Sequence, residues 1–439
     1  MALNVAIVGG GISGLSAAVS LRRAGHNVHV YERSAHNNEV GAAIHVPPNA
    51  ARALLAWGLD PIHAKFVTTK SSYRANEKTL VKFHTGKEVE EKIPIRCGAP
   101  WFLTHRVDLH EELKRLATEP NGPEAPGRPA TVSLQTKIVQ YNTAEPSITL
   151  ESGDIVKPDV VIAADGIHSI AVEAILGEPR PLGAPQNACF RFLIPADALN
   201  DDPRAKFFTE DDDGRMKFFV GETKRIVSYP CRNNEVHNFV AIYNTEHETL
   251  DLSKKESRHS PEDKAKLLEK YSDVHPDLFE VISKATEVMQ WPLLFRPPIP
   301  TWTKGSVALA GDAAHPMLPH QGQGGAQGIE DGVVLGLALV GATKETVAER
   351  LKTYEKIRRN RASIIQIFSN AGQDQPELIR KDVSAFMPED QIPKRPEDFF
   401  EYNFRYDIIE DSVGQLKEQY PGFELPANFF QNTPGKIAA

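Results

Sequence analysis

The 439-residue chain contains few cysteines, no excess of basic residues and no long hydrophobic run. Its three cysteines, Cys97, Cys189 and Cys231, show no CxxC spacing, so neither a disulfide framework nor a zinc site is indicated. No stretch reaches the ~18 apolar residues of a membrane span, and the apolar start at residues 2–8 is too short for a signal peptide. We therefore expect a cytoplasmic protein with no integral membrane segment. Because no metal-ligand spacing such as HExxH is present, we also expect no bound metal.

The charge balance argues against a nucleic-acid partner. The formal net charge is -8 at pH 7, whereas nucleic-acid-binding proteins carry a basic excess or a basic stripe. The densest basic run, Lys356–Arg361, is expected to form the solvated face of a helix. The 41% of hydrophobic and 25% of charged residues are typical of a packed globular protein.

A glycine motif stands near the N-terminus. Gly9, Gly11 and Gly14 form GxGxxG between the apolar run at residues 4–8 and a helical pattern, and Glu32 ends the next predicted strand. Glycine permits a tight turn and lets a pyrophosphate approach the helix N-terminus, while the carboxylate can accept from ribose hydroxyls. The motif predicts a bound dinucleotide with an unphosphorylated adenosine ribose, FAD or NAD, and does not distinguish between the two.

Two distant segments resemble each other in placing an aspartate after an apolar strand. Asp165 follows the run at residues 160–164, and Asp312 follows the run at residues 307–310 in Gly311-Asp312-Ala313-Ala314-His315-Pro316. Ligands of doubly wound sheets bind at the carboxyl ends of such strands. Taken singly, either aspartate could equally be a helix cap.

Together with GxGxxG, these segments resemble the motifs of the class A flavoprotein aromatic monooxygenases, and the pattern is most similar to the salicylate hydroxylase-like group and its fungal relatives. The resemblance covers residue 4 to about residue 363. It implies that FAD is the cofactor and that NADH or NADPH is a transient reductant. The cofactor-binding residues that it implies are Gly9, Gly11, Gly14, Glu32, Ala43, Arg106, Asp165, Asp312, Pro319, Gly322, Gly324 and Gly325.

The expected fold is α/β, with a Rossmann-like FAD-binding domain, an interleaved antiparallel β-sheet substrate domain and a helical C-terminal region. Residues 1–180 and 298–375 are assigned to the discontinuous FAD-binding domain. Residues 181–297, which contain short alternating runs, are assigned to the substrate domain, and residues 376–439 to a C-terminal extension. The chain is expected to be a monomer or a homodimer.

The loop from Pro319 to Gly325 precedes a predicted helix, so its backbone amides would point outward at a helix N-terminus. The resemblance implies that this loop lies beside the isoalloxazine ring, where such amides would stabilise negative charge on the flavin. His320, within the loop, is a candidate site residue. His315 is expected to brace its turn through hydrogen bonds rather than to act as an acid or base.

Two residues of the predicted antiparallel sheet are candidates for contact with the substrate. Arg191 lies between Phe190 and Phe192, so its side chain is expected on the opposite face of the strand, where it could pair with a carboxylate or phenolate. Tyr229 could exchange a proton or hydrogen bond with a substrate hydroxyl. For each residue, local pairing within the sheet is an equally good interpretation.

The predicted reaction is NAD(P)H-dependent hydroxylation, with O2, of a small phenolic or aromatic-acid substrate, with decarboxylation as a variant. Two alternatives stay open. One is a flavin-dependent epoxidase or oxidative rearrangement enzyme of secondary metabolism, and the other is a non-catalytic dinucleotide-binding protein.

Overall fold

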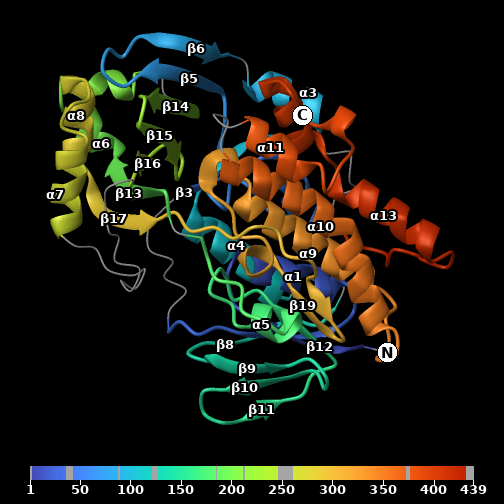
Figure 1. The fold of residues 1–439 in the computed structure, drawn as a ribbon. Coiled ribbons are helices and arrows are strands. Elements are labelled where there is room, and N and C mark those ends of the chain that lie inside the picture. Colours follow the sequence, from blue (N-terminus) through green and yellow to red (C-terminus); the bar gives the residue numbers. More distant parts are fainter. Residues whose placement is uncertain are drawn as a thin grey trace.

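The structure is a computed structural model of the chain, and it describes residues 2–35, 43–87, 89–120, 127–183, 185–210, 213–245, 261–371 and 376–431. It is an α/β fold with two large sheets (Figure 1). The first carries the predicted dinucleotide motifs, and the second carries the predicted substrate residues.

The first sheet has the strand order β18-β19-β12-β1-β2-β8 in the described part of the chain. Its strands are β1 (Asn4–Val8), β2 (Asn27–Tyr31), β8 (Thr131–Ser133), β12 (Val160–Ala163), β18 (Thr303–Lys304) and β19 (Val307–Leu309). β1 pairs in parallel with β2 and β12, and β12 pairs in parallel with β19. The carboxyl ends of β19, β12 and β1 therefore lie side by side at one edge of the sheet.

Helix α1 (Ile12–Arg23) follows β1 and packs against α9 (Gly324–Leu339). Three glycines of α9, spaced four residues apart, face α1: Gly328, Gly332 and Gly336. A Cβ atom on Gly332 would lie 2.6 Å from the carbonyl carbon of Ser16. Because these positions lack side chains, the two helices approach closely, and the N-terminus of α9 lies beside the glycine loop that precedes α1.

The second sheet has the order β17-β13-β16-β15-β14-β5-β6. Its strands are β5 (Ser71–Asn76), β6 (Lys82–Gly86), β13 (Asn187–Pro195), β14 (Arg215–Val220), β15 (Lys224–Cys231), β16 (Val236–Asn244) and β17 (Thr286–Pro292). It is antiparallel except for the β14–β5 pair. The predicted antiparallel sheet is thus present, but β5 and β6 come from outside the range 181–297. Their pattern is weak in the sequence because β6 is exposed at the sheet edge.

One face of this sheet packs on short helices. They are α6 (Ala196–Asn200), η1 (Lys206–Phe208), α7 (Pro261–Lys270) and α8 (Pro276–Ser283). Phe190 and Phe192 of β13 lie in the buried cluster on this face, with Phe208 and Leu278. The opposite face is directed toward the first sheet and its helices, as Figure 1 shows.

The remaining elements connect these layers. Two small sheets have the orders β3-β7-β4 and β11-β10-β9, with β3 (Ala43–Val46), β4 (Val67–Thr68), β7 (Phe102–His105), β9 (Ile138–Asn142), β10 (Ser147–Leu150) and β11 (Ile155–Val156). The helices are α2 (Pro48–Ala56), α3 (Val89–Cys97), α4 (Arg106–Thr118), α5 (Ala171–Leu176), η2 (Gly311–Ala313), η3 (Pro319–Gln321) and α10 (Val347–Ala371).

The C-terminal region is helical, as expected. It contains α11 (Pro376–Val383), η4 (Glu389–Gln391), α12 (Pro396–Phe400), the π-helical η5 (Glu401–Arg405) and α13 (Ile408–Gln419). Arg52 of α2 holds this region through an ion pair with Asp407 at 3.2 Å and a hydrogen bond of 2.7 Å to the carbonyl of Tyr406. The extension therefore packs on the body of the protein.

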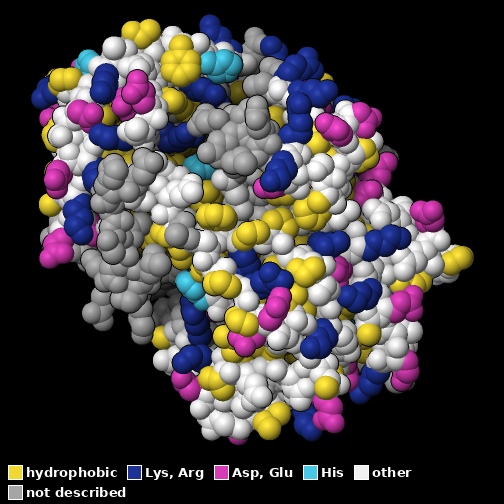
Figure 2. Space-filling model, in the orientation of Figure 1, with side chains coloured by type: hydrophobic (Ala, Val, Ile, Leu, Met, Phe, Trp, Pro, Cys, Tyr) yellow, Lys and Arg dark blue, Asp and Glu magenta, His cyan; other side chains and the backbone are white. Residues whose placement is uncertain are grey.

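No helix among the described residues is long and apolar enough to cross a membrane. On the face shown in Figure 2, acidic and basic side chains are interspersed rather than gathered into one field.

Candidate active site

The glycine motif occupies the turn between β1 and α1. Gly9 has a positive φ of 102°, and a Cβ atom there would lie 2.3 Å from the carbonyl oxygen of Ala164. A Cβ atom on Gly14 would lie 2.0 Å from the carbonyl oxygen of Gly9. Both positions therefore require glycine because backbone approaches backbone there.

Glu32 follows β2 and lies beside this turn. One carboxylate oxygen accepts a hydrogen bond of 2.7 Å from the Gly10 amide, and the other accepts from the Ser34 amide and hydroxyl. From the other side, His110 of α4 donates to the carbonyl of Gly10 at 2.6 Å. The glycine loop is thus held between β2 and α4, with Glu32 at its edge.

Asp165 lies next to the glycine loop because β12 is the neighbour of β1. A Cβ atom on Gly9 would lie 3.0 Å from the Cα atom of Asp165. The Tyr141 hydroxyl of β9 donates to the Asp165 carboxylate at 2.8 Å. Burial raises the pKa of Asp165, against the opposing effect of its hydrogen bonds.

Asp312 stands in η2, directly after β19, and its side chain is exposed. The preceding Gly311 has a φ of 61°, and a Cβ atom there would lie 2.1 Å from the Ser13 hydroxyl oxygen of α1. This turn therefore lies against the start of α1. The structure brings the loops of Gly9, Asp165 and Asp312 to the same sheet edge, as the motifs predict.

His315 braces this turn, which confirms the role expected for it. The side chain is fully buried, and its Nε2 donates to Asp331 of α9 at 2.7 Å. The same carboxylate oxygen accepts from the Gly311 amide at 2.8 Å. Burial by itself would raise the pKa of Asp331, but His315 and Arg358 of α10 together lower it. His315 is therefore a structural residue.

The basic run at residues 356–361 forms the expected solvated face only in part, because Lys356 is exposed but two of the arginines are buried. Arg358 is fully buried and pairs with Asp331 at 2.8 Å and with Glu330 at 2.5 Å. Arg361 is 6% exposed and also pairs with Glu330, at 2.8 Å. The prediction was wrong for Arg358 and Arg361 because their acidic partners come from α9, and the run by itself does not reveal them.

Arg296 ties two of the motif loops together. Its guanidinium donates to the carbonyl of Ile167, in the loop after β12, at 3.0 Å. It also donates to the carbonyl of Ala313, in the loop after β19, at 3.3 Å. No motif in the sequence indicates this role, since Arg296 lies in the irregular segment between β17 and β18.

The loop from Pro319 to Gly325 leads directly into α9, which begins at Gly324. Gly322 has a φ of 60°, and no side chain caps the helix. The amides of the loop therefore stand at an uncapped helix N-terminus, which suits negative charge. His320 is half-buried within the loop.

Arg106 and Ala43 lie where the two sheets meet. Arg106 is the first residue of α4, directly after β7, and is half-buried. Ala43 begins β3, and its amide donates to the Asn238 side chain of β16 at 2.9 Å. The second sheet therefore holds the strand that carries Ala43.

We call the loops that contain Gly9, Asp165 and Asp312, together with residues 319–325, the flavin loops. The two predicted substrate residues lie on the face of the second sheet that is directed toward these loops. Arg191 lies opposite Phe190 and Phe192, as predicted, and over the Trp291 ring at 5.8 Å. Its Nε is buried without a hydrogen-bond partner in the described part of the chain. Tyr229 is 5% exposed, and burial raises its pKa, while Arg191 has the opposite effect. The two residues are therefore close enough to interact electrostatically.

His45 of β3 is a site residue that the sequence analysis missed. Its ring centroid lies 6.5 Å from that of Tyr229, and Trp101 donates to its Nδ1 at 2.9 Å. Strand alternation from Ala43 is the signal that could have found it, because residues 43 and 45 lie on one face of the strand. Trp101 comes from a loop before β7, and no comparable signal marks it.

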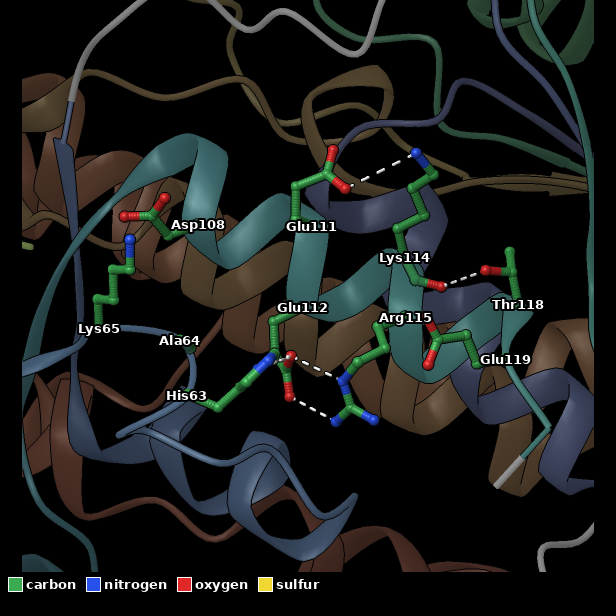
Figure 3. A pocket seen from close by; sticks show the side chains of 10 residues that line it. All are labelled: His63, Ala64, Lys65, Asp108, Glu111, Glu112, Lys114, Arg115, Thr118 and Glu119. Carbon is green, nitrogen blue, oxygen red and sulfur yellow. Dashed lines mark hydrogen bonds and ion pairs between the residues drawn. The ribbon is translucent and has the colours of Figure 1, made fainter. Parts of the chain in front are cut away.

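A separate hollow of about 390 Å³ lies along α4 (Figure 3). Its lining includes His63, Asp108, Glu112 and Arg115. Glu112 accepts two hydrogen bonds from Arg115, at 2.8 and 2.6 Å, and Figure 3 shows them turned toward one another. None of the predicted cofactor or substrate residues lines this hollow.

The motif residues fit FAD. A Cβ atom on Gly11 would meet nothing within 4 Å, and no side chain caps α1, so the space before the helix suits a pyrophosphate. Glu32 lies at the end of β2, where an adenosine ribose would bind. β3 and the loop before α9 face each other, with the Ile44 side chain 2.6 Å from where a Cβ atom on Gly325 would lie. The fold and site thus define a flavoprotein with a separate substrate-binding sheet.

Comparison with known proteins supports this class. Residues 2–369 match the family model described as "FAD binding domain". The FAD-dependent monooxygenase cfoG of Aspergillus candidus is 45% identical over 435 residues, covering 97% of this chain and 98% of the relative. Hispidin-3-hydroxylase of Neonothopanus nambi is 31% identical, covering 86% of this chain and 90% of the relative. A salicylate hydroxylase substrate complex has the same fold, with a TM-score of 0.70, 22% identity and coverage of 94% and 97%.

The chain belongs to the FAD-binding-domain family of class A flavoprotein monooxygenases. It is an FAD-dependent monooxygenase of the aromatic hydroxylase type.

Proposed function

We propose that this monooxygenase hydroxylates a small phenolic or aromatic-acid substrate, using O2 and either NADH or NADPH as reductant, with decarboxylation when the attacked carbon bears a carboxyl group. The observation that supports this proposal is the presence of two polar side chains, Arg191 and Tyr229, on the face of the second sheet that is directed toward the flavin loops. The Nε of Arg191 is buried without a hydrogen-bond partner among the described residues, and Tyr229, on the same face, is 5% exposed. An unsatisfied buried polar group costs stability, so the retention of the Arg191 Nε supports a polar ligand.

Apolar side chains surround these two groups. On the same face lie the partly buried Val227, Phe218, Val240 and Trp291, from strands β14 to β17. Such a lining suits an aromatic ring, while the guanidinium suits a carboxylate or phenolate and the phenol suits a hydroxyl. Among the relatives, one is named as a hydroxylase of hispidin and another as a hydroxylase of 3-hydroxybenzoate.

The chain's own residues would bind the cofactor at the sheet edge already described. Gly9, Gly11 and Gly14 would hold the pyrophosphate, Glu32 the adenosine ribose and Asp312 the ribityl chain. Arg106 and Asp165 would hold the cofactor from α4 and from the loop after β12, with Ala43 at the flavin. Pro319, Gly322, Gly324 and Gly325 would border the flavin ring.

Bound FAD would accept electrons from NAD(P)H and transfer one oxygen atom from O2 to the substrate. Arg191 would orient the substrate through its negative group, and Tyr229 would hydrogen-bond its hydroxyl. The apolar face would exclude water, which strengthens these interactions. His320 in the loop beside the ring is a further candidate for contact with the substrate.

The test is to measure which ring compounds stimulate NADH or NADPH oxidation and yield a hydroxylated product. Phenols, aromatic acids, indoles and polyketides would be compared. Stimulated oxidation with stoichiometric hydroxylation by a phenol or aromatic acid supports the proposal. An epoxide or rearranged product from a non-phenolic compound would instead assign the chain to epoxidation or rearrangement chemistry.

Asp312→Ala tests the cofactor assignment separately. We expect the variant to lose most of its FAD, measured by visible absorbance, and its NAD(P)H oxidation. Asp390→Ala, an exposed position in η4, is the matched control and should retain both. Unchanged FAD content and oxidation in Asp312→Ala would show that this aspartate does not bind the cofactor.

A further inference from the structure

The C-terminal extension reaches the loop at residues 319–325, one of the flavin loops, through the π-helical turn η5. Asn403 of η5 is 1% exposed, and its side-chain amide donates to the Gln321 side-chain oxygen of the loop at 2.9 Å. π-helical turns are rare and occur frequently at functional sites. The extension thus contacts this loop directly, although it lies beyond residues 2–369, which the family model matches.

The next residue of η5, Phe404, is connected to the same loop by a second route. Its ring packs on Trp101, with ring centroids 4.8 Å apart. The Trp101 indole N–H donates to Nδ1 of His45 at 2.9 Å. The His45 imidazole fills the space that a Cβ atom on Gly322 would occupy, and Gly322 has a φ of 60°. Consecutive residues of η5 are therefore connected to consecutive residues of the loop, Gln321 and Gly322.

η5 is itself anchored to the buried ion-pair network behind the loops. Arg361 of α10 donates to the carbonyls of Tyr402 and Asn403 at 2.9 and 3.1 Å. The same guanidinium pairs with the fully buried Glu330 of α9 at 2.8 Å. A buried network whose members are paired stabilises one arrangement. The position of η5 is therefore fixed relative to α9, the helix into which the loop leads.

The loop depends on contacts with other elements for its position. Gln321 and Gly322 are only half-buried, and no side chain caps the helix that follows them. Backbone amides at an uncapped helix N-terminus stabilise negative charge, but only where they are held toward that charge in advance. Contacts that fix the loop therefore determine how well its amides serve a bound flavin.

We propose that η5 clamps this loop, and that Asn403 and Trp101 are positioning residues that hold its amides toward the flavin ring. The inference rests on the proposed function, in which the loop borders that ring. Reduction adds negative charge to the flavin, and the held amides stabilise this charge. Loss of the clamp should therefore make the bound flavin harder to reduce, whereas a purely structural contact would change stability and leave the flavin's reduction potential unchanged.

The first experiment measures the reduction equilibrium of the bound flavin against a reference dye in Asn403→Leu, Gln321→Leu and the double variant. Each single variant removes the same hydrogen bond, and we expect the equilibrium constant for reduction to fall by about 3- to 10-fold. Because both residues belong to one contact, the double variant should match the singles within about 2-fold. Gln321 is half-buried, so Gln321→Leu keeps the test valid if Asn403→Leu does not fold.

Trp101→Phe tests the second route, because it keeps a ring against Phe404 and removes the N–H that binds His45. The two routes are separate, so the effects of Trp101→Phe and Asn403→Leu on the reduction equilibrium should multiply when the two are combined. Arg405→Leu is the matched control. It lies in η5, its side chain is 69% exposed, and it should behave as the wild type.

Hydrogen exchange of the FAD-loaded proteins gives a readout that needs no reaction. We expect the amides of residues 319–325 to exchange at least about 5-fold faster in Asn403→Leu and Gln321→Leu than in the wild type and Arg405→Leu. Unchanged exchange in both variants would overturn the clamp.

The outcomes separate this inference from the proposed function. A shifted reduction equilibrium in Gln321→Leu but not in a folded Asn403→Leu would refute the clamp and leave the loop at the flavin. An unchanged equilibrium in both variants would refute the clamp together with the placement of the loop. Neither measurement needs a substrate, so shifts in both variants support the clamp even if no ring compound stimulates NAD(P)H oxidation, a result that would refute only the proposed substrate class.

Discussion

Two groups of polar side chains border the predicted flavin loops, and they differ in whether their charged groups form ion pairs within the described residues. Behind the loops, His315, Asp331, Glu330, Arg358 and Arg361 are all buried and all paired. In front of the loops, on the second sheet, the Nε of Arg191 is buried without a hydrogen-bond partner among the described residues, and the nearby Tyr229 is 5% exposed.

The difference separates structural from ligand-binding residues. Both groups lie within or beside the same loops, and both contain arginine. A buried network whose members are all partnered stabilises one arrangement of the loops. Buried groups without partners are retained at a cost in stability, which a ligand offsets when it binds. Ion pairing, rather than residue type, therefore distinguishes Arg358 from Arg191.

The largest expected effect comes from breaking the paired group. Arg358→Met leaves Glu330 and Asp331 buried without this cation, and we expect a loss of about 3–5 kcal/mol in the free energy of unfolding, measured by urea denaturation. Lys356→Met, an exposed position on the same helix, should change it by less than about 0.5 kcal/mol. Equal stability of the two variants would refute the structural role of the network.

A smaller loss is expected where α1 and α9 meet behind the loops. Gly332→Ala places a methyl group 2.6 Å from the Ser16 backbone, so the helices must separate, at about 1–3 kcal/mol. Gly414→Ala, in α13, has nothing within 4 Å of the new Cβ atom and should instead stabilise by about 0.5–1 kcal/mol. Thermal unfolding of the two alanine variants should therefore shift in opposite directions, and shifts of the same sign would contradict the close approach of the helices.

His237 of β16 offers a third environment, because it is buried against Phe208 on the far face of the second sheet. Burial, assisted by Lys217, lowers its pKa from 6.5 to about 3. Between these values the unfolded chain binds a proton that the folded chain does not, so stability falls as the pH falls below 6.5. From pH 7 to pH 5, we expect the wild type to lose about 1–2 kcal/mol more than His237→Gln. The loss is measured by urea denaturation of both proteins at the two pH values. If the wild type and His237→Gln lose the same free energy of unfolding between pH 7 and pH 5, His237 does not contribute.

The smallest effect on stability is expected in the group on the second sheet. Tyr229→Phe removes one hydroxyl and keeps the ring, so the free energy of unfolding should change by less than about 0.5 kcal/mol. The KM for the phenolic effector should nevertheless rise about 10-fold, because the hydrogen bond to the substrate is lost. Urea denaturation checks the free energy of unfolding, and steady-state kinetics on the same preparation checks the KM. A large loss of stability would move Tyr229 into the structural group.

The sequence by itself determined the fold class and the dinucleotide site, and the family resemblance of its motifs implied that the dinucleotide is FAD. GxGxxG after a strand, Glu32 at the end of the next strand, and the aspartates after β12 and β19 are local patterns, since each depends only on a strand, its turn and the following helix. Alternation likewise placed Arg191 on the face opposite its phenylalanine neighbours, because the side-chain period of a strand is two. These features could be predicted because neighbouring residues set them.

Only the tertiary structure decided what required distant partners. The sequence around Arg358 predicts a solvated helix face. The side chain is nevertheless buried, because α9 supplies two carboxylates that pair with it. His45 accepts a hydrogen bond from Trp101, which lies 56 residues away in the chain and is packed against Phe404. Charge pairing and this hydrogen bond depend on contacts between separate elements, and a periodic pattern along one element carries no record of them.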